Sequence, residues 1–423
     1  MSLARYPEYK PSGLAWLGDV PVHFDVCAMK RMMLNITDGA HVSPETEGGI
    51  YDFVSTKDIN DAGIDFDGSL KTSPSSYEYL VRTGCKPLCG DVLFSKDGTI
   101  GRTVVVKESH EFVVASSLII IRPDSTVLDS TFLHYLCQSF VVTQQVEGFV
   151  KGAGLPRLSI QNLLKVFGVF PSLLDQQSIA TFLDRETQKI DALIAEQRRL
   201  VDVLTEKRQA MISHAVTKGL NPNAMMKDSG IVWLGQVPEH WEVKRLKLLC
   251  DVQTGDKDTV DAIDEGEYPF FVRSQTVERI NTFTFDCEAV LTAGDGVGVG
   301  KVFHYVNGKF DFHQRVYMMN NFRWVTGKFF FRYLAALFHK VALDGGAKST
   351  VDSLRMPLFM NFVISVPPNN EQSTIVAFID TETAKFDTLT DEANRAIDLL
   401  QERRSALIFA SVTGMIDVRG MRE

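Results

Sequence analysis

The chain contains two internal repeats, and these constrain its fold more than any other feature of the sequence. Residues 12–26 read SGLAWLGDVPVHFDV, and residues 229–243 read SGIVWLGQVPEHWEV. A longer, gap-free repeat relates residues 175–217 to residues 371–413. The order along the chain is therefore A–B–A′–B′, with a variable stretch inside each A segment. A chain duplicated in this way can fold with a pseudo-two-fold axis, like a fused dimer.

The two longer repeat copies predict long helices. Neither contains glycine or proline, and both are rich in residues that favour helices. Each copy would extend roughly 65 Å as one helix, at about 1.5 Å per residue. A helix of this length with a narrow apolar stripe needs another helix to cover the stripe, so we expect the two to pair as an antiparallel coiled coil. A coiled coil that serves only for dimerisation is the alternative interpretation.

Apolar residues at heptad spacing define the expected seam between these helices. In the first helix the seam residues are Ile179, Leu183, Ile190, Leu193, Leu200, Leu204 and Met211. In the second they are Ile375, Ile379, Phe386, Leu389, Ala393, Ala396, Leu400 and Leu407.

The segments before each helix have the pattern of mixed sheet domains. The clearest predicted strands are 92–95, 103–106, 112–114 and 118–121 in the first, and 268–272, 302–305, 316–319 and 362–366 in the second. A helix is expected over residues 130–142 and over residues 326–341. The predicted division is a globular domain at 1–172, a helix at 173–222, a second globular domain at 223–368 and a second helix at 369–423.

Composition limits the classes of protein to be considered. The chain has 423 residues and a net charge of −9, and none of its four segments holds more basic than acidic residues. Any contact with nucleic acid must therefore come from local groups of cations, or partners must supply part of the phosphate affinity. No apolar run suits a membrane span, and the first residues lack the apolar core of a signal peptide, so a cytoplasmic protein is expected.

Signatures of metal binding and catalysis are missing. The six cysteines are scattered and complete no zinc-site spacing, so we expect no metal site. The glycine-rich stretch Gly294–Lys301 fails the phosphate-loop pattern, because Asp295 stands at the first glycine position and Val302 where Ser or Thr is required. A tight turn between strands is the better interpretation, both there and at Gly98–Arg102. We therefore expect no catalytic residues in this chain.

Four repeated motifs carry a family resemblance. The openings Ser12–Phe24 and Ser229–Trp241 follow the pattern SG-x-x-WLG-x-VP-x-HW, with Phe24 in place of the last tryptophan. The helix entries Leu174–Thr187 and Asn370–Thr383 follow a pattern EQ-x-x-I-x-x-FLD-x-x-T, with Asp175 in place of the glutamate and Ile379 in place of the leucine. With these motifs in this order, the chain resembles the specificity subunits of type I restriction-modification systems. The resemblance covers both halves.

The resemblance implies an α/β (α+β) fold, with two target-recognition domains separated by two long helices. Each domain would bind one half of a split double-stranded DNA site. The helices would set the spacing and dock methyltransferase subunits, and restriction subunits would complete the complex. S-adenosylmethionine, ATP and Mg would act in those partners, and this chain would hold no cofactor.

Candidate DNA contacts are cations and amides beside glycines or strand ends, where side chains in exposed loops can reach phosphates or bases. In the first domain they are Lys96, Arg102, Lys151 and Arg157. In the second they are Arg273, Gln275, Lys301, Gln314, Arg315 and Lys348. Trp16 and Trp233 recur in the repeated openings, so packing in a shared core is expected of them, in preference to stacking on bases.

Two other classes of function stay open on the sequence. A coiled-coil scaffold or adaptor would use the sheet domains to bind proteins and would show no dependence on DNA. An enzyme with an unfamiliar site would show turnover by the isolated chain. A specificity subunit differs from both, because it binds DNA selectively and does so weakly without partners.

Overall fold

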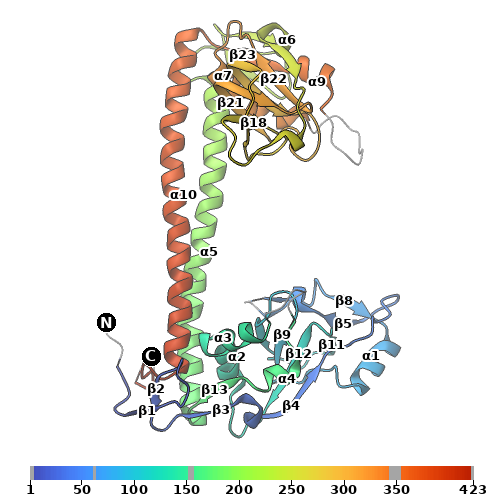
Figure 1. Ribbon diagram of the computed structural model, residues 1–423, viewed down its shortest axis with the longest axis vertical. Coiled ribbons are helices and arrows are strands. Elements are labelled where there is room, and N and C mark those ends of the chain that lie inside the picture. The colour runs from blue at the N-terminus through green and yellow to red at the C-terminus, as the bar shows by residue number, and fades with distance from the viewer. Residues whose placement is uncertain (1–3, 61–62, 151–156, 343–353, 421–423) are drawn as a thin grey trace. The chain divides into compact units, whose positions relative to one another are not determined.

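The computed structural model describes residues 4–60, 63–150, 157–342 and 354–420, and the chain forms two compact units. Unit 1 comprises Met1–Gln197 and Arg395–Glu423, and unit 2 comprises Arg198–Asn394. Each unit contains one sheet domain and a part of both long helices (Figure 1). The exact four-segment boundaries expected from the sequence stay a prediction.

The sheet domain of unit 1 combines two main sheets with short helices. Its strands are β1 (Tyr9–Pro11), β2 (Asp19–Pro21), β3 (Asp25–Ala28), β4 (Met33–Asp38), β5 (Tyr51–Val54), β6 (Ile59–Asn60), β7 (Gly63–Ile64), β8 (Leu70–Thr72), β9 (Val92–Ser95), β10 (Thr103–Val105), β11 (Phe112–Val114), β12 (Leu118–Pro123) and β13 (Phe167–Phe170). Its short helices are α1 (Pro74–Arg82), α2 (Ser130–Gln138), α3 (Phe140–Phe149) and α4 (Ile160–Leu163). The main sheets have the orders β10-β9-β12-β4 and β11-β5-β8.

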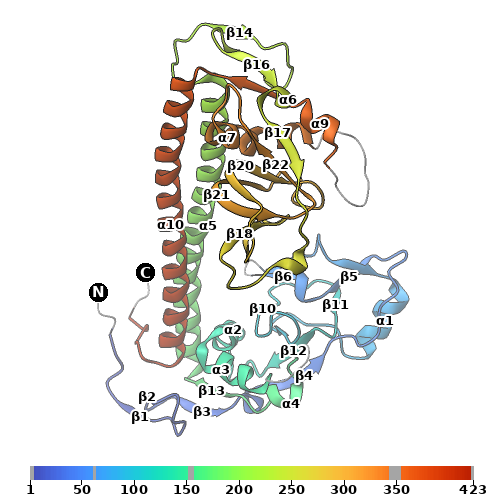
Figure 2. The same cartoon turned by 45° about the horizontal axis from the view of Figure 1, so that its top comes forward.

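The sheet domain of unit 2 repeats this plan around one larger sheet. Its strands are β14 (Met226–Asp228), β15 (Gln236–Pro238), β16 (Glu242–Arg245), β17 (Asp251–Thr254), β18 (Tyr268–Phe271), β19 (Glu278–Ile280), β20 (Phe285–Ala293), β21 (Phe303–Phe312), β22 (Val316–Asn320) and β23 (Val363–Val366). Its short helices are α6 (Leu246–Leu249), α7 (Gly327–Leu337), α8 (His339–Ala342) and α9 (Met356–Met360). The main sheet has the order β17-β22-β20-β21-β18-β19 (Figure 2).

One long strand explains why unit 2 has a single main sheet where unit 1 has two. In unit 2, β21 pairs antiparallel with β20 along most of its length and parallel with β18 at its end. In unit 1, β10 pairs with β9, and the separate strand β11 pairs parallel with β5. The strand neighbours correspond otherwise, so the duplication expected from the sequence is confirmed in the topology.

The long helices are α5 (Leu173–Lys218) and α10 (Asn369–Val412). Within each unit their segments lie side by side and run in opposite directions, as both views show (Figures 1 and 2). In unit 2, Arg208 and Asp387 form an ion pair with an Nη1–Oδ1 distance of 3.3 Å. The predicted antiparallel pairing is therefore confirmed within each unit.

The predicted seam is wrong at three positions. Leu193, Leu200 and Leu389 are 52%, 42% and 47% exposed. The inward-facing residue after Ile190 is instead Ile194, which is buried. Alternating steps of three and four residues keep an apolar stripe on one side of an α-helix. After Ile190 the step is four residues, to Ile194, so Leu193 lies outside the stripe and faces solvent. The seam residues found buried are Ile179, Leu183, Ile190, Leu204, Ala393, Ile375 and Ile379, while Met211, Phe386, Ala396, Leu400 and Leu407 are half-buried.

A buried glutamine ties the start of each long helix to its sheet domain. Gln176 donates from Nε2 to the carbonyls of Val127 and Pro171, both at 2.9 Å, and its Oε1 accepts from the amide of Asp129 at 2.9 Å. Gln372 repeats the arrangement in unit 2, with the carbonyls of Trp324 and Pro367 and the amide of Thr326. Asp129 and Thr326 are in turn the N-cap residues of α2 and α7. The glutamine shared by the two repeats therefore fixes two helix starts at once.

A glycine ends each long helix where it meets an opening motif. Gly219, at φ 73°, follows α5 and lies where a Cβ would be 3.1 Å from the Trp241 ring. Gly414, also at φ 73°, lies where a Cβ would be 2.4 Å from Pro21. Only glycine adopts this left-handed conformation without strain. The openings therefore pack against the ends of these helices.

The local predictions are largely confirmed. Strands 92–95 and 112–114 form with the predicted bounds, and the other six predicted strands form with different ends. The helix expected over 130–142 is interrupted at Ser139, which has an extended backbone and starts α3. Trp233 stacks on Phe362 at 5.4 Å between ring centroids, as expected of a packing residue, whereas Trp16 is 38% exposed.

No helix within the described ranges is long and apolar enough to span a membrane. The same part of the chain contains no group of three or more His, Cys, Asp or Glu side chains that could hold a metal ion.

Candidate nucleic-acid interface

The glycine-rich turns singled out in the sequence occupy corresponding places in the two sheet domains. One joins β9 to β10 and the other joins β20 to β21. Both begin with an Asp-Gly pair, Asp97-Gly98 and Asp295-Gly296, whose glycines have φ values of 68° and 76°. Each aspartate is therefore followed by a glycine in the left-handed region, which points to equivalent positions for Asp97 and Asp295.

Backbone hydrogen bonds confirm this equivalence. The Lys96 amide donates to the Ser117 carbonyl at 2.9 Å, and the Gly294 amide donates to the Arg315 carbonyl at 2.8 Å. The strand that follows Ser117 is β12, and the strand that follows Arg315 is β22. Ser117 and Arg315 therefore hold the same position beside the Asp-Gly turn.

Asp295 holds two of the predicted arginines in unit 2. Arg273 donates from Nη1 to Oδ1 of Asp295 at 2.9 Å, and Arg315 donates from Nη1 to Oδ2 at 2.7 Å. The Arg273 and Arg315 side chains are 43% and 61% exposed, whereas that of Asp295 is 13% exposed. The structure thus brings together two arginines that are 42 residues apart in the sequence.

Electrostatics favour the charged form of the Asp295 carboxylate. Burial raises the pKa of this carboxyl, but the hydrogen bonds and positive charges of Arg315 and Arg273 outweigh burial, and the net pKa is lower than its ordinary value. Asp295 is therefore ionised at neutral pH and binds both guanidinium groups as a charge-assisted acceptor.

Gln314 extends the same surface. Its Nε2 donates to Oδ2 of Asp258 at 2.7 Å, and its backbone amide donates to the Lys257 carbonyl at 2.8 Å. His313 Nε2 lies 3.6 Å from the other Asp258 oxygen. Gln314 is exposed beside Arg315, so an amide and a guanidinium side chain are presented together.

The other predicted residues of unit 2 have less defined surroundings. Gln275 and Lys301 are exposed, and neither side chain has a hydrogen-bond or ion-pair partner within the described residues. Lys348 lies outside the described residues, as does Lys151 of the first domain.

Lys96 corrects the expectation of an exposed cation in unit 1. Its side chain is only 4% exposed, and its Nζ forms an ion pair with Asp38. An ammonium buried against a carboxylate cannot extend to a phosphate without breaking that pair. Lys96 is therefore a structural residue in this geometry, in place of the exposed DNA contact expected from the sequence.

Arg157 and Arg102 remain at the surface of unit 1. Arg157 forms an ion pair with Asp97 at an Nε–Oδ1 distance of 3.1 Å and is 52% exposed. Arg102 is exposed and donates from Nη1 to the Ile59 carbonyl at 3.1 Å. Each unit thus has an Asp-Gly turn whose aspartate holds at least one arginine.

The sequence interpretation missed the role of these two aspartates. It treated Asp295 as the residue that breaks a phosphate-loop pattern and did not consider Asp97. The signal that could have found them is the Asp-Gly pair itself, which stands at the start of both turns.

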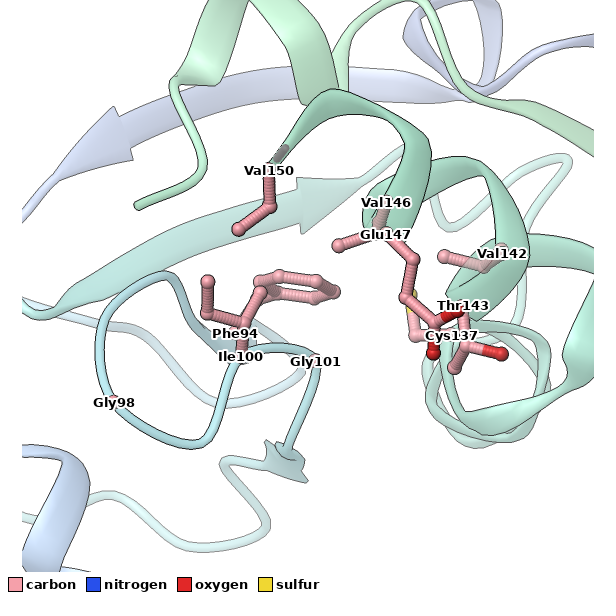
Figure 3. Close-up of a pocket in the computed structure, with 10 residues that line it drawn as sticks. All are labelled: Phe94, Gly98, Ile100, Gly101, Cys137, Val142, Thr143, Val146, Glu147 and Val150. Atoms are coloured by element: carbon pink, nitrogen blue, oxygen red, sulfur yellow. The ribbon is translucent and has the colours of Figure 1, made fainter. Parts of the chain in front are cut away.

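An apolar pocket of about 360 Å³ lies behind the turn of unit 1. Figure 3 shows Phe94, Ile100 and Val150 facing into it from the turn side and from the end of α3, with Glu147 at its edge. Its lining is mostly apolar, and the few polar groups do not form a catalytic arrangement. The pocket suits an apolar group and adds no chemistry to the surface described above.

Comparisons with known proteins agree with this geometry. A family model described as the type I restriction modification DNA specificity domain matches residues 33–200 and 238–398. Among similar proteins, the type I restriction enzyme EcoDI specificity subunit of Escherichia coli is 28% identical over 180 residues, which are 43% of this chain and 39% of that protein. The MjaVIII specificity subunit of Methanocaldococcus jannaschii is 27% identical over 217 residues, which are 51% of this chain and 45% of that protein. The matched regions thus span less than half of either relative.

Solved structures share the fold. One comes from a study of complex assembly and conformational transition in a type I restriction-modification system; it superposes with a TM-score of 0.71 at 16% identity and covers 93% of this chain and 99% of its own. The HsdS subunit of Thermoanaerobacter tengcongensis superposes with a TM-score of 0.50 at 15% identity and covers 93% of this chain and 98% of its own.

Proposed function

Because the chain belongs to the type I restriction-modification DNA specificity family, we propose that it is the subunit that reads a split DNA site, one half-site for each sheet domain. The observation that carries the proposal is the pair of equivalent Asp-Gly turns. The turn aspartates hold equivalent positions, and each of them pairs with at least one exposed arginine. Arginine is the side chain most used for specific contacts to DNA bases, and two equivalent surfaces suit a target with two halves.

Exposed cations of both units form the proposed contact set. In unit 1 these are Arg102 and Arg157, and in unit 2 they are Arg273, Lys301 and Arg315, with Gln275 and Gln314 as amide donors. Lys151 and Lys348 stay in the proposal on sequence grounds alone. Since the net charge is −9, we expect weak binding by the isolated chain, with partner subunits supplying much of the phosphate affinity.

The long helices have a separate role in the proposal. They set the distance between the half-sites and dock methyltransferase subunits, and restriction subunits join that complex. The chain itself has no catalytic activity; S-adenosylmethionine, ATP and Mg act in the partners. The names of the two relatives, both specificity subunits of type I restriction enzymes, support a recognition role for this chain.

Methylome sequencing tests the proposal. A host would express this chain with a cognate methyltransferase subunit, and matched hosts would express each protein alone. We expect a new split motif that is modified only when both proteins are present. No new motif, with expression and complex formation verified, would favour a scaffold that binds proteins through its sheet domains.

A further inference from the structure

The Asp-Gly turns of the two units differ in how many arginines they hold. In unit 1, Asp97 pairs with Arg157 alone among the described residues, and in unit 2, Asp295 pairs with both Arg273 and Arg315. If both domains read DNA as proposed above, this difference predicts a difference between the two half-sites.

The two arginines of unit 2 are oriented with most of their donors free. Each gives one Nη1 hydrogen bond to its own oxygen of Asp295. A guanidinium group has five N–H donors, and no other side-chain bond of Arg273 or Arg315 occurs within the described part of the chain. The shared carboxylate restricts both side chains before any ligand binds, so less conformational entropy is lost on binding.

The charges nearby favour a base edge over a phosphate. Asp295 and Asp258 lie within the same group as the two arginines, and the charge of Asp258 also acts on Arg315. Two carboxylates beside two guanidinium groups leave little net positive charge for a phosphate anion. The major-groove edge of guanine is neutral and offers the acceptors O6 and N7, to which arginine binds with two parallel hydrogen bonds.

Hydroxyl residues stand at the corresponding positions of unit 1. Ser117 corresponds to Arg315 by the backbone bonds given above. The Ala115 amide donates to the Val54 carbonyl at 2.8 Å, as the His313 amide donates to the Phe271 carbonyl at 2.9 Å. Counting two residues onward from Val54 and from Phe271 makes Thr56 the counterpart of Arg273. Unit 1 therefore lacks both arginines of this arrangement.

From this arrangement, and resting on the proposed function, we infer that Arg273 and Arg315 read guanine in the half-site bound by unit 2, and that Asp295 is the residue that positions them. The unit 1 half-site is not read in this way. The proposed function places Arg273 and Arg315 on the contact surface, and the base that they read and the positioning role of Asp295 are added here.

The test compares variants in the complex with the methyltransferase subunit. R273Q and R315Q each remove a guanidinium group. D295N removes the negative charge of the carboxylate that orients both arginines. R323Q is the matched control, because Arg323 is 48% exposed and also pairs with an aspartate, Asp251, but lies beyond the opposite end of β22. The readout is methylation at every single-base variant of the wild-type motif.

We expect the wild-type motif to contain at least one G·C pair in the half-site of unit 2. R273Q or R315Q should lower discrimination at such a pair by roughly tenfold to a hundredfold, with no change in the other half-site. D295N should lower discrimination at the same base pair to a smaller extent. R323Q should leave the recognised motif unchanged.

Lysine variants separate base reading from phosphate contact. Lysine keeps the positive charge but cannot form the two parallel hydrogen bonds of arginine. R273K and R315K should therefore relax the guanine position as the glutamine variants do, and they also serve if a glutamine variant fails to fold. Near wild-type behaviour of both lysine variants, with a uniform loss of methylation in R273Q and R315Q, would assign these residues to phosphates and overturn the inference.

Two further outcomes have distinct meanings. A wild-type split motif that keeps its specificity in all of these variants rejects the inference and leaves the proposed function intact. The absence of any split motif for the wild-type chain rejects the proposed function, and the inference falls with it.

Discussion

Arg404 donates from Nε to Oδ1 of Asp191 at 3.0 Å and so joins α10 to α5 within unit 1. The two residues are 213 positions apart in the chain. In unit 2, Arg208 and Asp387 form the corresponding pair at 3.3 Å. Both arginines and both aspartates are 196 residues from their counterparts, the offset of the long repeat. The duplication therefore preserved an inter-helix contact as well as a sequence.

R404A should lower the free energy of unfolding by about 1 kcal/mol, since the pair is partly exposed and screened by water. Its side chains are 22% and 42% exposed, and Arg404 also donates to Gln138 at 3.2 Å. Denaturant unfolding measures the change. The control R403A alters an exposed neighbour and should stay within about 0.5 kcal/mol of wild type. Equal effects of both variants would show that the ion pair contributes nothing.

Q176A should destabilise the protein by about 3 kcal/mol, because it leaves buried carbonyls and a buried amide without partners. Gln176 is fully buried and makes three hydrogen bonds to the backbone. The exposed neighbour Gln177 supplies the control Q177A. Thermal or denaturant unfolding measures both variants. If Q176A lowered the free energy of unfolding by less than about 1 kcal/mol, the anchoring role of Gln176 would be contradicted.

K96A should act on stability and leave the salt dependence of DNA binding unchanged. Removing one partner of a largely buried ion pair costs about 2 kcal/mol when the other partner, here Asp38, is partly exposed. The exposed residue Lys107 provides the stability control K107A. Binding of the methyltransferase complex to its site is then measured at several salt concentrations. A phosphate contact through Lys96 would instead reduce the salt slope by about one.

A seven-residue insertion in both long helices should change the preferred gap between half-sites. Placed between Gln197 and Arg198 and between Asn394 and Arg395, it keeps the alternating steps of the seam. It lengthens each helix by roughly 10 Å, the length of about three base pairs. Methylome sequencing reports the new gap, and an unchanged gap would show that the helices do not set the spacing. The control is the same insertion in α5 alone, which should misalign the pair and abolish methylation.

Exchanging residues 30–170 for the same region of another member of the family should change one half-site only. The two units have separate sheets and separate hydrophobic cores, so each domain can be replaced without repacking the other. The new motif is read by methylome sequencing, with the reciprocal exchange of residues 247–366 as the matched control. A change in both half-sites would reject independent reading.

Much of the architecture could be predicted because it depends on local patterns that occur twice. Residues 175–217 and 371–413 lack glycine and proline, are rich in helix-favouring residues and have apolar residues at heptad spacing, and together these features predicted α5 and α10. Short β-rich runs predicted strands such as β9 and β11 with the correct bounds. The repeat of Gln176 as Gln372 marked an equivalent position but did not show that both side chains bind backbone groups at helix starts.

The candidate site was predicted less well, because its geometry depends on contacts between distant segments. Lys96 has the sequence environment of an exposed loop cation, yet β4 brings Asp38 against it and buries the pair. Leu193 fits a heptad as well as Ile194 does, and only the pairing of the helices decides which of them faces inward.

By itself, the sequence determined that the protein is duplicated, that each half joins a sheet domain to a long helix, and that the repeated motifs are those of a known family. Only the tertiary structure decided that Asp295 holds two arginines and Asp97 one. The physical reason is that repeats and periodicity record which residue types recur along the chain. The partner of a charged side chain, in contrast, is set by which strands and turns meet in space.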